Sequence, residues 1–301
     1  MIKNQEFTDY LKLHFIVLIW GFSTILGLLI TTSALEIVLF RTLIATLALA
    51  AWLYSRQQSF NLGWRAIIKI LATGFLIAAH WILFFWSARL STASICLAGM
   101  ATCSFWTSLI EPLMTKRKIK IYELLLGLFV IAGLYIILQF ELNYIWGISM
   151  AVLSAILCSV FTVLNGNYAK IYPAYTITFY EMLGACLGTF IFIIFYDIQL
   201  LKYPVMLSDW LYLFILAGLC TVYAFAVSVE VQKTLSAFVV NLTVNLEPVY
   251  GIIFAFLIFG DEEQMSSGFY IGTSIILLSV LVYPLINRVM RRRALRSDLI
   301  R

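Results

Sequence analysis

The stretch TLSAFVVNLTVNLEPVYGIIFAFLIFGDE, which runs from Thr234 to Glu262, decides the fold. It is apolar over most of its length, apart from Asn241, Asn245 and Glu247 near its middle, where Pro248 follows. A hydrocarbon core about 30 Å thick is crossed by roughly 20 helical residues. The stretch therefore predicts a helix that crosses a membrane and carries polar groups at a depth without water.

Glu247 and Pro248 are the residues of this span that a purely structural helix does not need. A carboxyl group inside a membrane is costly unless it is paired or neutralised, so its default interpretation is functional. We expect Glu247 to line or gate a cavity; the alternative is a hydrogen bond to a neighbouring helix or to the interrupted backbone. Pro248 lacks the N–H that would bond the carbonyl of Val244, which predicts a helix break.

The direction of these side chains depends on whether the helix stays straight. At about 100° per residue, Asn241, Asn245 and Pro248 share one face, and Glu247 points away from it. We expect the asparagines to face the cavity, with Glu247 on its flank. A kink at Pro248 that rotates the second part of the helix is the alternative.

Nine further apolar runs of spanning length occupy nearly all of the 301 residues, of which 63% are hydrophobic. The predicted fold class is therefore an all-α membrane protein with ten transmembrane helices and no soluble domain. The first run is too long for a signal-peptide core. The ten spans cover approximately residues 11–30, 34–54, 66–88, 92–115, 121–139, 144–165, 175–196, 208–229, 234–258 and 268–287.

Lys and Arg residues are distributed unequally over the two sides of these spans. Seventeen of them share a side with the N-terminus, whereas Arg89 and Lys202 lie on the other side and Arg41 lies within a span. Because basic residues stay in the cytoplasm, both termini are predicted to be cytoplasmic, in a multi-pass protein of the cell (inner) membrane. Residues 288–301 form a basic cytoplasmic tail that contacts membrane lipid.

Composition also excludes several partners. The net charge of +5 comes from basic residues at helix ends, so we expect no nucleic-acid partner. The five cysteines lie inside apolar runs without metal-ligand spacing, and we expect no metal or cofactor. The pairs Gly184–Gly188 and Gly268–Gly272 have the spacing of close packing or of a dimerisation face, which leaves a monomer and a homodimer open.

The chain contains an internal repeat, with a first five-helix unit at 11–139 and a second at 144–287. Residues 69–117 align with 213–261, and a slightly different shift places Arg41 on Glu181. Since each unit holds an odd number of spans, the second must be inverted relative to the first. Inverted repeats with a binding site near the middle of the membrane are typical of transporters.

Several motifs of this chain resemble those of the EamA family of the drug/metabolite transporter superfamily. The resemblance implies a permease for a metabolite or drug-like compound, often an exported amino acid. The first repeat has Cys103-Ser104 where the second has Glu247-Pro248, which leaves a matching break in the fourth span open. The matching residues are Trp20-Gly21, Phe40-Arg41, Phe179-Tyr180-Glu181, Leu246-Glu247-Pro248, Gly251 and Gly260-Asp261-Glu262.

His80 and Arg41 are two further candidates for the site. His80 shares one polar stripe of its helix with Thr73 and Ser87, and Phe84 lies on the same stripe. We expect His80 in the cavity or in a proton relay, or else as a neutral histidine bonded to a nearby carbonyl. We expect Arg41 to meet a substrate carboxylate, a helix end or a lipid phosphate, or else to extend to the headgroups.

The predicted cavity combines aromatic rings (Trp20, Trp81, Phe84 and Trp106) with the amides of Asn241 and Asn245 and with one or two charges. That mixture suits an amphipathic or zwitterionic small organic solute, moved by alternating access, with Glu247 or His80 coupling transport to protons. A flippase for a lipid or lipid-linked sugar is the alternative. An enzyme is not expected, because no nucleophile with a base and no metal cluster shares one depth.

Overall fold

The computed structural model describes residues 2–202, 205–260 and 265–299, and it is helical throughout, with no strand in those ranges. Ten helices, or pairs of helices in line, are long and apolar enough to cross a membrane, which confirms the predicted fold class. The helices are α1 (Ile2–Gly21), α2 (Ser23–Leu29), α3 (Ala34–Ser55), α4 (Trp64–Leu90), α5 (Ala93–Met100), α6 (Cys103–Thr115), α7 (Ile121–Phe140), α8 (Ile145–Tyr168), α9 (Ala174–Tyr196), α10 (Leu207–Ile215), α11 (Ala224–Val231), α12 (Ala237–Val244), α13 (Glu247–Phe259) and α14 (Ser267–Leu299).

Several spans are interrupted rather than continuous. The first is divided between α1 and α2, the ninth between α12 and α13, and a π-helical segment, Leu216–Tyr223, separates α10 from α11. The fourth span is also divided, between α5 and α6, although no proline lies at that point. The hydroxyl of Thr102 donates to the carbonyl of Gly99 at 2.8 Å and satisfies one acceptor that the break releases. The fourth and ninth spans, which are counterparts in the two repeats, are therefore both divided, whereas the counterparts of the first and eighth spans, α8 and α4, are continuous.

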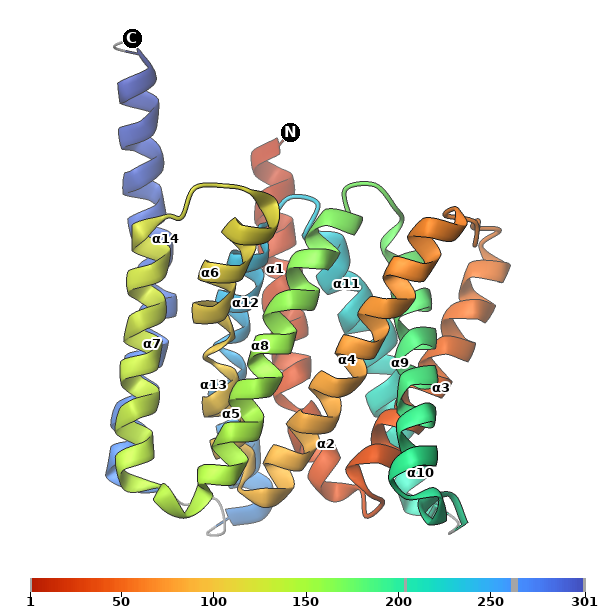
Figure 1. The fold of residues 1–301 in the computed structure, drawn as a ribbon. Coiled ribbons are helices and arrows are strands. Elements are labelled where there is room, and N and C mark those ends of the chain that lie inside the picture. The colour runs from red at the N-terminus through yellow and green to blue at the C-terminus, as the bar shows by residue number, and fades with distance from the viewer. Residues whose placement is uncertain (1, 203–204, 261–264, 300–301) are drawn as a thin grey trace.

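The helices form one bundle in which α1 begins and α14 ends on the same side (Figure 1). We call that side the terminal end and the other side the opposite end. The first span runs away from the terminal end, whereas its counterpart α8 runs towards it (Figure 1). The pair α7 and α14 forms one edge of the bundle, and α3 and α9 lie near the other.

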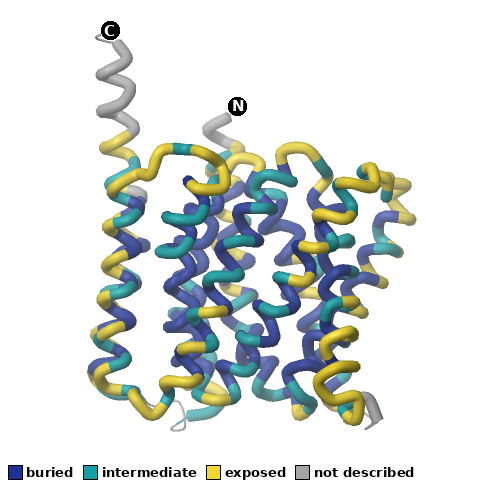
Figure 2. The backbone as a smooth tube through the Cα atoms, viewed as in Figure 1, coloured by how far each residue is buried: buried dark blue, intermediate teal, exposed yellow. Residues whose placement is uncertain are grey.

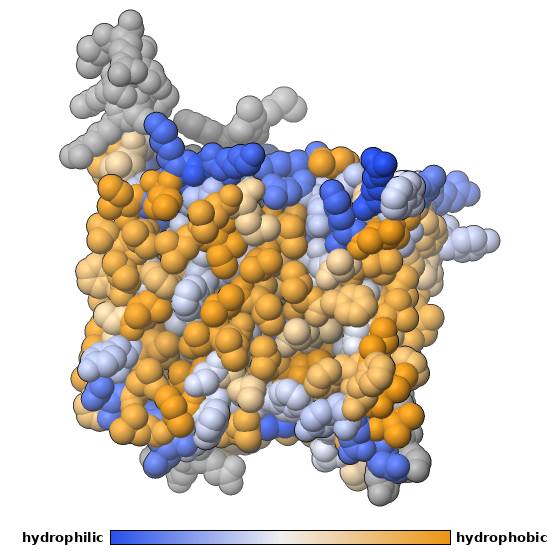
Figure 3. Space-filling model, viewed as in Figure 1, coloured by the Kyte–Doolittle hydropathy of each residue, from blue (hydrophilic) through white to orange (hydrophobic). Residues whose placement is uncertain are grey.

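Exposed residues cover the outward faces of the helices, while the inward faces are buried (Figure 2). Many exposed side chains are large and apolar, such as Leu257 and Phe195. On the face shown in Figure 3 they form a hydrophobic band between two more hydrophilic ends. This distribution is the one that a protein surrounded by lipid requires.

Glycines allow neighbouring helices to approach closely inside the chain. A Cβ on Gly184 would lie 2.2 Å from the carbonyl oxygen of Leu71, and Gly188 packs against Phe75. A Cβ on Gly272 would lie 2.5 Å from the carbonyl oxygen of Gly133. Both glycine pairs singled out in the sequence are thus used for close packing within one chain.

Two ionic clusters connect helices of different repeats at the terminal end. Lys12 Nζ lies 3.0 Å from Glu230 Oε1, and the hydroxyl of Thr234 donates to Asp9 Oδ2 at 2.6 Å. The connection between α11 and α12 is therefore fixed to α1.

The second cluster is centred on Arg117, in the connection between α6 and α7. Its Nη2 lies 2.9 Å from both Glu111 Oε2 and Glu123 Oε2. Burial disfavours the charge of Arg117, but these two carboxylates outweigh that effect and raise the pKa of Arg117. Glu111 Oε2 also accepts the backbone N–H of Phe238 at 3.0 Å, so it caps the first turn of α12.

Candidate functional site

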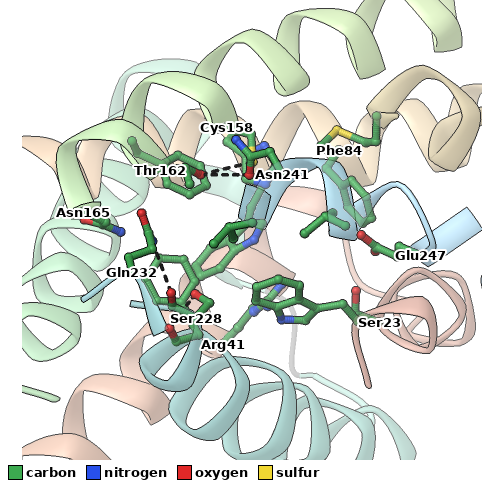
Figure 4. A pocket seen from close by; sticks show the side chains of 18 residues that line it. Ser23, Arg41, Phe84, Cys158, Thr162, Asn165, Ser228, Gln232, Asn241 and Glu247 are labelled. Carbon is green, nitrogen blue, oxygen red and sulfur yellow. Dashed lines mark hydrogen bonds between the residues drawn. The ribbon is translucent and has the colours of Figure 1, made fainter. Parts of the chain in front are cut away.

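A cavity lies between the two repeats, in the middle of the bundle (Figure 4). The volume open to the centre of a water molecule is about 70 Å³, which is room for a few waters or one small solute. Its wall combines six aromatic rings with polar and charged groups. The lining residues are Trp20, Ser23, Arg41, His80, Trp81, Phe84, Met100, Cys158, Phe161, Thr162, Asn165, Phe225, Ser228, Gln232, Val240, Asn241, Val244 and Glu247.

The break in the ninth span places both Asn241 and Glu247 in this wall. On a straight helix they would face different ways, but α12 ends at Val244 and α13 begins at Glu247, so the helical periodicity is interrupted between them. Asn245 does not line the cavity. Its Nδ2 instead donates to Ser104 Oγ at 2.9 Å, so it links the break of the ninth span to that of the fourth.

Arg41 is held in the wall by one neighbour from each repeat, Thr221 of the second and Trp81 of the first. Its Nε donates to Thr221 Oγ1 at 2.6 Å, and the guanidinium carbon lies 3.9 Å from the centre of the Trp81 ring. The residue is only 2% exposed, so the alternative in which it extends to the headgroups is wrong. The hydrogen bonds found in the described part of the chain use Nε and leave its two terminal nitrogens for a ligand.

Glu247 lies on another part of the same wall and is 6% exposed (Figure 4). Among the described residues its carboxyl group takes part in no ion pair and no side-chain hydrogen bond. The charges of Arg41 and Glu247 influence each other, yet the two groups are farther apart than the 4.0 Å of an ion pair. The cavity is therefore lined by a guanidinium group and a carboxyl group that are not paired with each other.

His80 borders the cavity but is committed to α8. Its Nδ1 lies 3.0 Å from the carbonyl oxygen of Ser154 and 2.7 Å from the hydroxyl of the same residue. Its ring packs edge-on against Phe161, with ring centres 5.2 Å apart. This arrangement is that of a histidine bonded to a nearby carbonyl, and it includes no direct contact with Glu247.

Of the remaining predicted residues, Trp20 and Asn241 belong to the wall, whereas Trp106 does not line the cavity. Trp20 Nε1 donates to the carbonyl of Cys220 at 3.0 Å, across the two repeats. The amide of Asn241 accepts from Thr162 Oγ1 at 3.3 Å and donates to Thr107 Oγ1 at 2.7 Å. Trp20 and Asn241 are thus fixed in place, whereas Arg41 and Glu247 keep their ligand-binding atoms uncommitted.

Sequence reasoning missed Asn165, Ser228 and Gln232, which lie across the cavity from Glu247 (Figure 4), near the C-terminal ends of α8 and α11. Gln232 also borders a second pocket at that end, so its side chain lies between the two spaces. Asn165 could have been singled out from the sequence, because it is an amide inside an apolar span. Ser228 and Gln232 could not, because serine and glutamine near a helix end are ordinary there.

Arg41 and Glu181 occupy equivalent positions, each being the eighth residue of its helix, α3 or α9. They form no ion pair with each other in the described structure. Arg41 reaches the cavity, whereas Glu181 is completely buried behind it and accepts a hydrogen bond from Asn165.

Ten spans in two inverted repeats around a polar cavity define a membrane transporter. The chain belongs to the EamA-like transporter family, whose model matches residues 10–139 and 145–283. This is a family of transporters and not of enzymes. One solved structure, described only as the crystal structure of a protein, has 15% identity and a TM-score of 0.69, and it covers 92% of this chain and 97% of its own. That likeness shows the fold. No protein of curated function matches the chain.

Proposed function

We propose that the protein carries a small zwitterionic organic solute, such as an amino acid, across the cell (inner) membrane by alternating access. The observation that carries this proposal is that the guanidinium group of Arg41 and the carboxyl group of Glu247 line one cavity without pairing with each other. An inorganic ion would need one sign of charge only. A solute with a carboxylate and an ammonium group satisfies both charges at once and neutralises the site.

Binding of such a solute follows from the chemistry of the wall. The planar guanidinium of Arg41 suits a carboxylate, which can accept from both terminal nitrogens. The carboxylate of Glu247 suits the ammonium group. The rings of Trp81, Phe84 and Phe225 then offer an apolar surface to the rest of the solute. The small volume of the cavity favours a solute of amino-acid size over a lipid.

The direction of access is part of the proposal. Lining residues such as Asn165 and Gln232 continue from the cavity towards the terminal end, where Gln232 borders the second pocket. Towards the opposite end, Gly21 packs against the backbone of Gly251 and Gly251 packs against Leu97, which closes the bundle. With the termini in the cytoplasm, the cavity is closed to the outside in this conformation, and the side chain of Gln232 separates it from the pocket on the cytoplasmic side. An exporter that is loading its solute would have this arrangement.

Glu247 is also the proposed link between transport and protons. When no ammonium group is present, its carboxylate lacks a partner, so a proton stabilises the empty site. Exchange of that proton for the solute would couple their movements. His80 borders the same cavity, and its bonds to Ser154 make it the less available of the two.

The test begins with a comparison of metabolites exported by cells with and without the chain. It continues with uptake of the labelled compounds that differ into proteoliposomes. Arg41→Gln and Glu247→Gln should each abolish most of the transport, because each leaves one charge of the solute unpaired in a buried site. Arg56→Gln, a change at an exposed arginine, is the matched control and should transport like the parent.

Two results of the same assay would contradict the proposal. Equal transport by Glu247→Gln and the parent from about pH 5.5 to about pH 8 would remove proton coupling through this carboxyl group. Full activity of both charge variants on the identified solute would remove the zwitterion site itself.

A further inference from the structure

A second buried carboxyl group, Glu181, lies outside the cavity wall and has no role in solute binding. It lies in the middle of α9, is 0% exposed, and packs where α9 and α4 approach most closely. A Cβ on Gly74 of α4 would lie 2.3 Å from the carbonyl oxygen of Glu181, so no lipid or loop enters from that side. The side chain has one hydrogen-bond partner in the described structure, Asn165 of α8.

The contact between Glu181 and Asn165 leaves one oxygen of each group unsatisfied. Asn165 Nδ2 donates to Glu181 Oε2 at 3.5 Å. The other two atoms, Glu181 Oε1 and Asn165 Oδ1, are buried and have no hydrogen-bond partner. Both are acceptors if the carboxyl group is ionised. A proton on Oε1 turns it into a donor for Oδ1, and the acid and amide then pair through two parallel hydrogen bonds.

The charged and titratable groups on the surrounding helices do not compensate a negative charge at Glu181. Arg41 of α3 is bonded to Thr221, His80 of α4 is bonded to Ser154, and Glu230 of α11 is paired with Lys12. The hydroxyl of Tyr168 on α8 lies within electrostatic range and 3.4 Å from Thr73 Oγ1. The other charged residues of α3 and α4 are Glu36, Arg65, Lys69 and Arg89, which lie towards the ends of those helices.

We infer that Glu181 and Asn165 form a proton-binding site beside the cavity, and that Glu181 carries the proton in this conformation. An ionised carboxylate without a cation is strongly disfavoured in a site without water, and protonation removes that cost. The same proton satisfies both unpartnered oxygens.

Asn165 gives this site its access route. Its side chain lines the cavity on one side and bonds Glu181 on the other, so a proton leaving Glu181 reaches the cavity past this amide (Figure 4). The amide of Gln232 lies in the same region of the wall and also has an unpartnered buried oxygen. The site is separate from Glu247, so it would hold a proton in addition to the one proposed for Glu247.

The test is infrared spectroscopy of the purified full-length protein in lipid, which needs no substrate. A protonated carboxyl group gives a carbonyl stretch that a carboxylate lacks. Without solute, the parent should show this band at neutral pH from both Glu247 and Glu181. The part that remains in Glu247→Gln belongs to Glu181, and it should disappear in the double variant Glu247→Gln with Glu181→Gln. Asp209→Asn is the matched control, because Asp209 is equally buried but accepts hydrogen bonds from both the N–H and the hydroxyl of Thr31.

Asn165→Leu provides a second measurement if Glu181→Gln does not fold. It should shift the Glu181 band and slow its exchange with deuterium severalfold, since the amide partner and the route to the cavity are lost. A band that is unchanged in both variants would overturn the inference. A band that disappears when sodium chloride replaces choline chloride would also overturn it, because Glu181 would then bind sodium and not a proton. These readouts do not depend on transport, so the proposed function can fail while this site stands.

Discussion

At the scale of single residues, the most informative feature is the way Arg41 is tethered. Thr221 accepts the hydrogen bond of Nε, and the ring of Trp81 covers the face of the guanidinium group. These two contacts fix the direction in which the two terminal nitrogens point. Thr221 can do this because it lies on the π-helical segment, where its hydroxyl donates to the carbonyl of Leu216 at 2.9 Å. A local irregularity of the backbone thus orients the proposed substrate-binding charge.

This tether makes the lysine variant a sharp test. Arg41→Lys keeps the positive charge but loses the hydrogen bond to Thr221, the stacking on Trp81 and the forked geometry. We expect about 1.5–3 kcal/mol of binding energy to be lost, which is a factor of roughly 10 to 100 in transport efficiency. The measurement is the concentration dependence of solute uptake into proteoliposomes, and parent-like uptake by Arg41→Lys would show that a point charge is sufficient.

Some site residues could be predicted from the sequence because their cost in a membrane does not depend on the details of packing. A buried carboxyl group, a buried guanidinium or a histidine inside a span needs a partner wherever it points. The amides were harder. Asn241 and Asn245 share a face on an ideal helix, but a two-residue break directs one to the cavity and the other to Ser104. The break depends on contacts between helices, which the hydrophobic periodicity of the sequence does not reveal.

At the scale of elements, the breaks of the fourth and ninth spans depend on each other. The bond from Asn245 to Ser104 joins them, and the fourth span breaks without any proline. Pro248 lies in the first turn of α13, where its missing N–H costs little. Proline therefore permits the break, and the contact between the two spans maintains it.

Pro248→Ala should accordingly have a mild effect. We expect a change in stability below about 1 kcal/mol and more than about half of the parent transport, because the Ser104 contact still holds the break open. Asn245→Leu is the comparison variant and should lose most of the transport by leaving the break without its anchor. Thermal unfolding in detergent and uptake in liposomes measure both effects. The reverse order of the two variants would show that proline alone makes the break.

Arg117 is the element-scale test of how the terminal end is fixed. Arg117→Gln leaves the carboxylates of Glu111 and Glu123 without their shared cation, and we expect a loss of about 1–3 kcal/mol in stability. Since these carboxylates raise the pKa of Arg117, its contribution is complete below its unfolded-state pKa and disappears only as pH rises through the folded-state pKa.

The loss caused by Arg117→Gln should therefore be the same at about pH 7 and about pH 9. Thermal unfolding of the parent and the variant at both values is the measurement. Lys118→Gln, at an exposed neighbour in the same connection, is the control and should unfold like the parent. A loss that disappears by about pH 9 would assign the effect to another group.

At the scale of the whole molecule, the number, length and order of the spans could be predicted because the bilayer fixes them. A run of apolar residues must cross the membrane as a helix, and an odd number of spans per repeat forces inversion. The interruptions inside spans could not be predicted in the same way. Neither the division of the fourth span nor the π-helical segment of the eighth changes the hydropathy of its run.

The orientation in the membrane is the whole-molecule prediction. Reporter fusions after Arg56, after Lys116 and at the C-terminus should report the cytoplasm, and fusions after Thr32 and after Leu142 should report the outside, because basic residues accumulate on one side. At each position one reporter that is active only in the cytoplasm and another that is active only outside are fused in separate experiments. Each fusion then serves as the control for the other. A C-terminus outside the cell would reverse the proposed direction of access.

The contact between α7 and α14 has a consequence for how the protein is made. Gly133 and Gly272 pack backbone to backbone, although α14 is the last span to leave the ribosome. Until then the groove of α7 at Gly133 has no protein partner and is open to lipid or to the cell's quality control. While the second repeat is being synthesised, the face of α7 at Gly133 therefore remains uncovered. We therefore expect chains that stop before Ser267 to be degraded faster than the full-length chain, in which α14 covers Gly133.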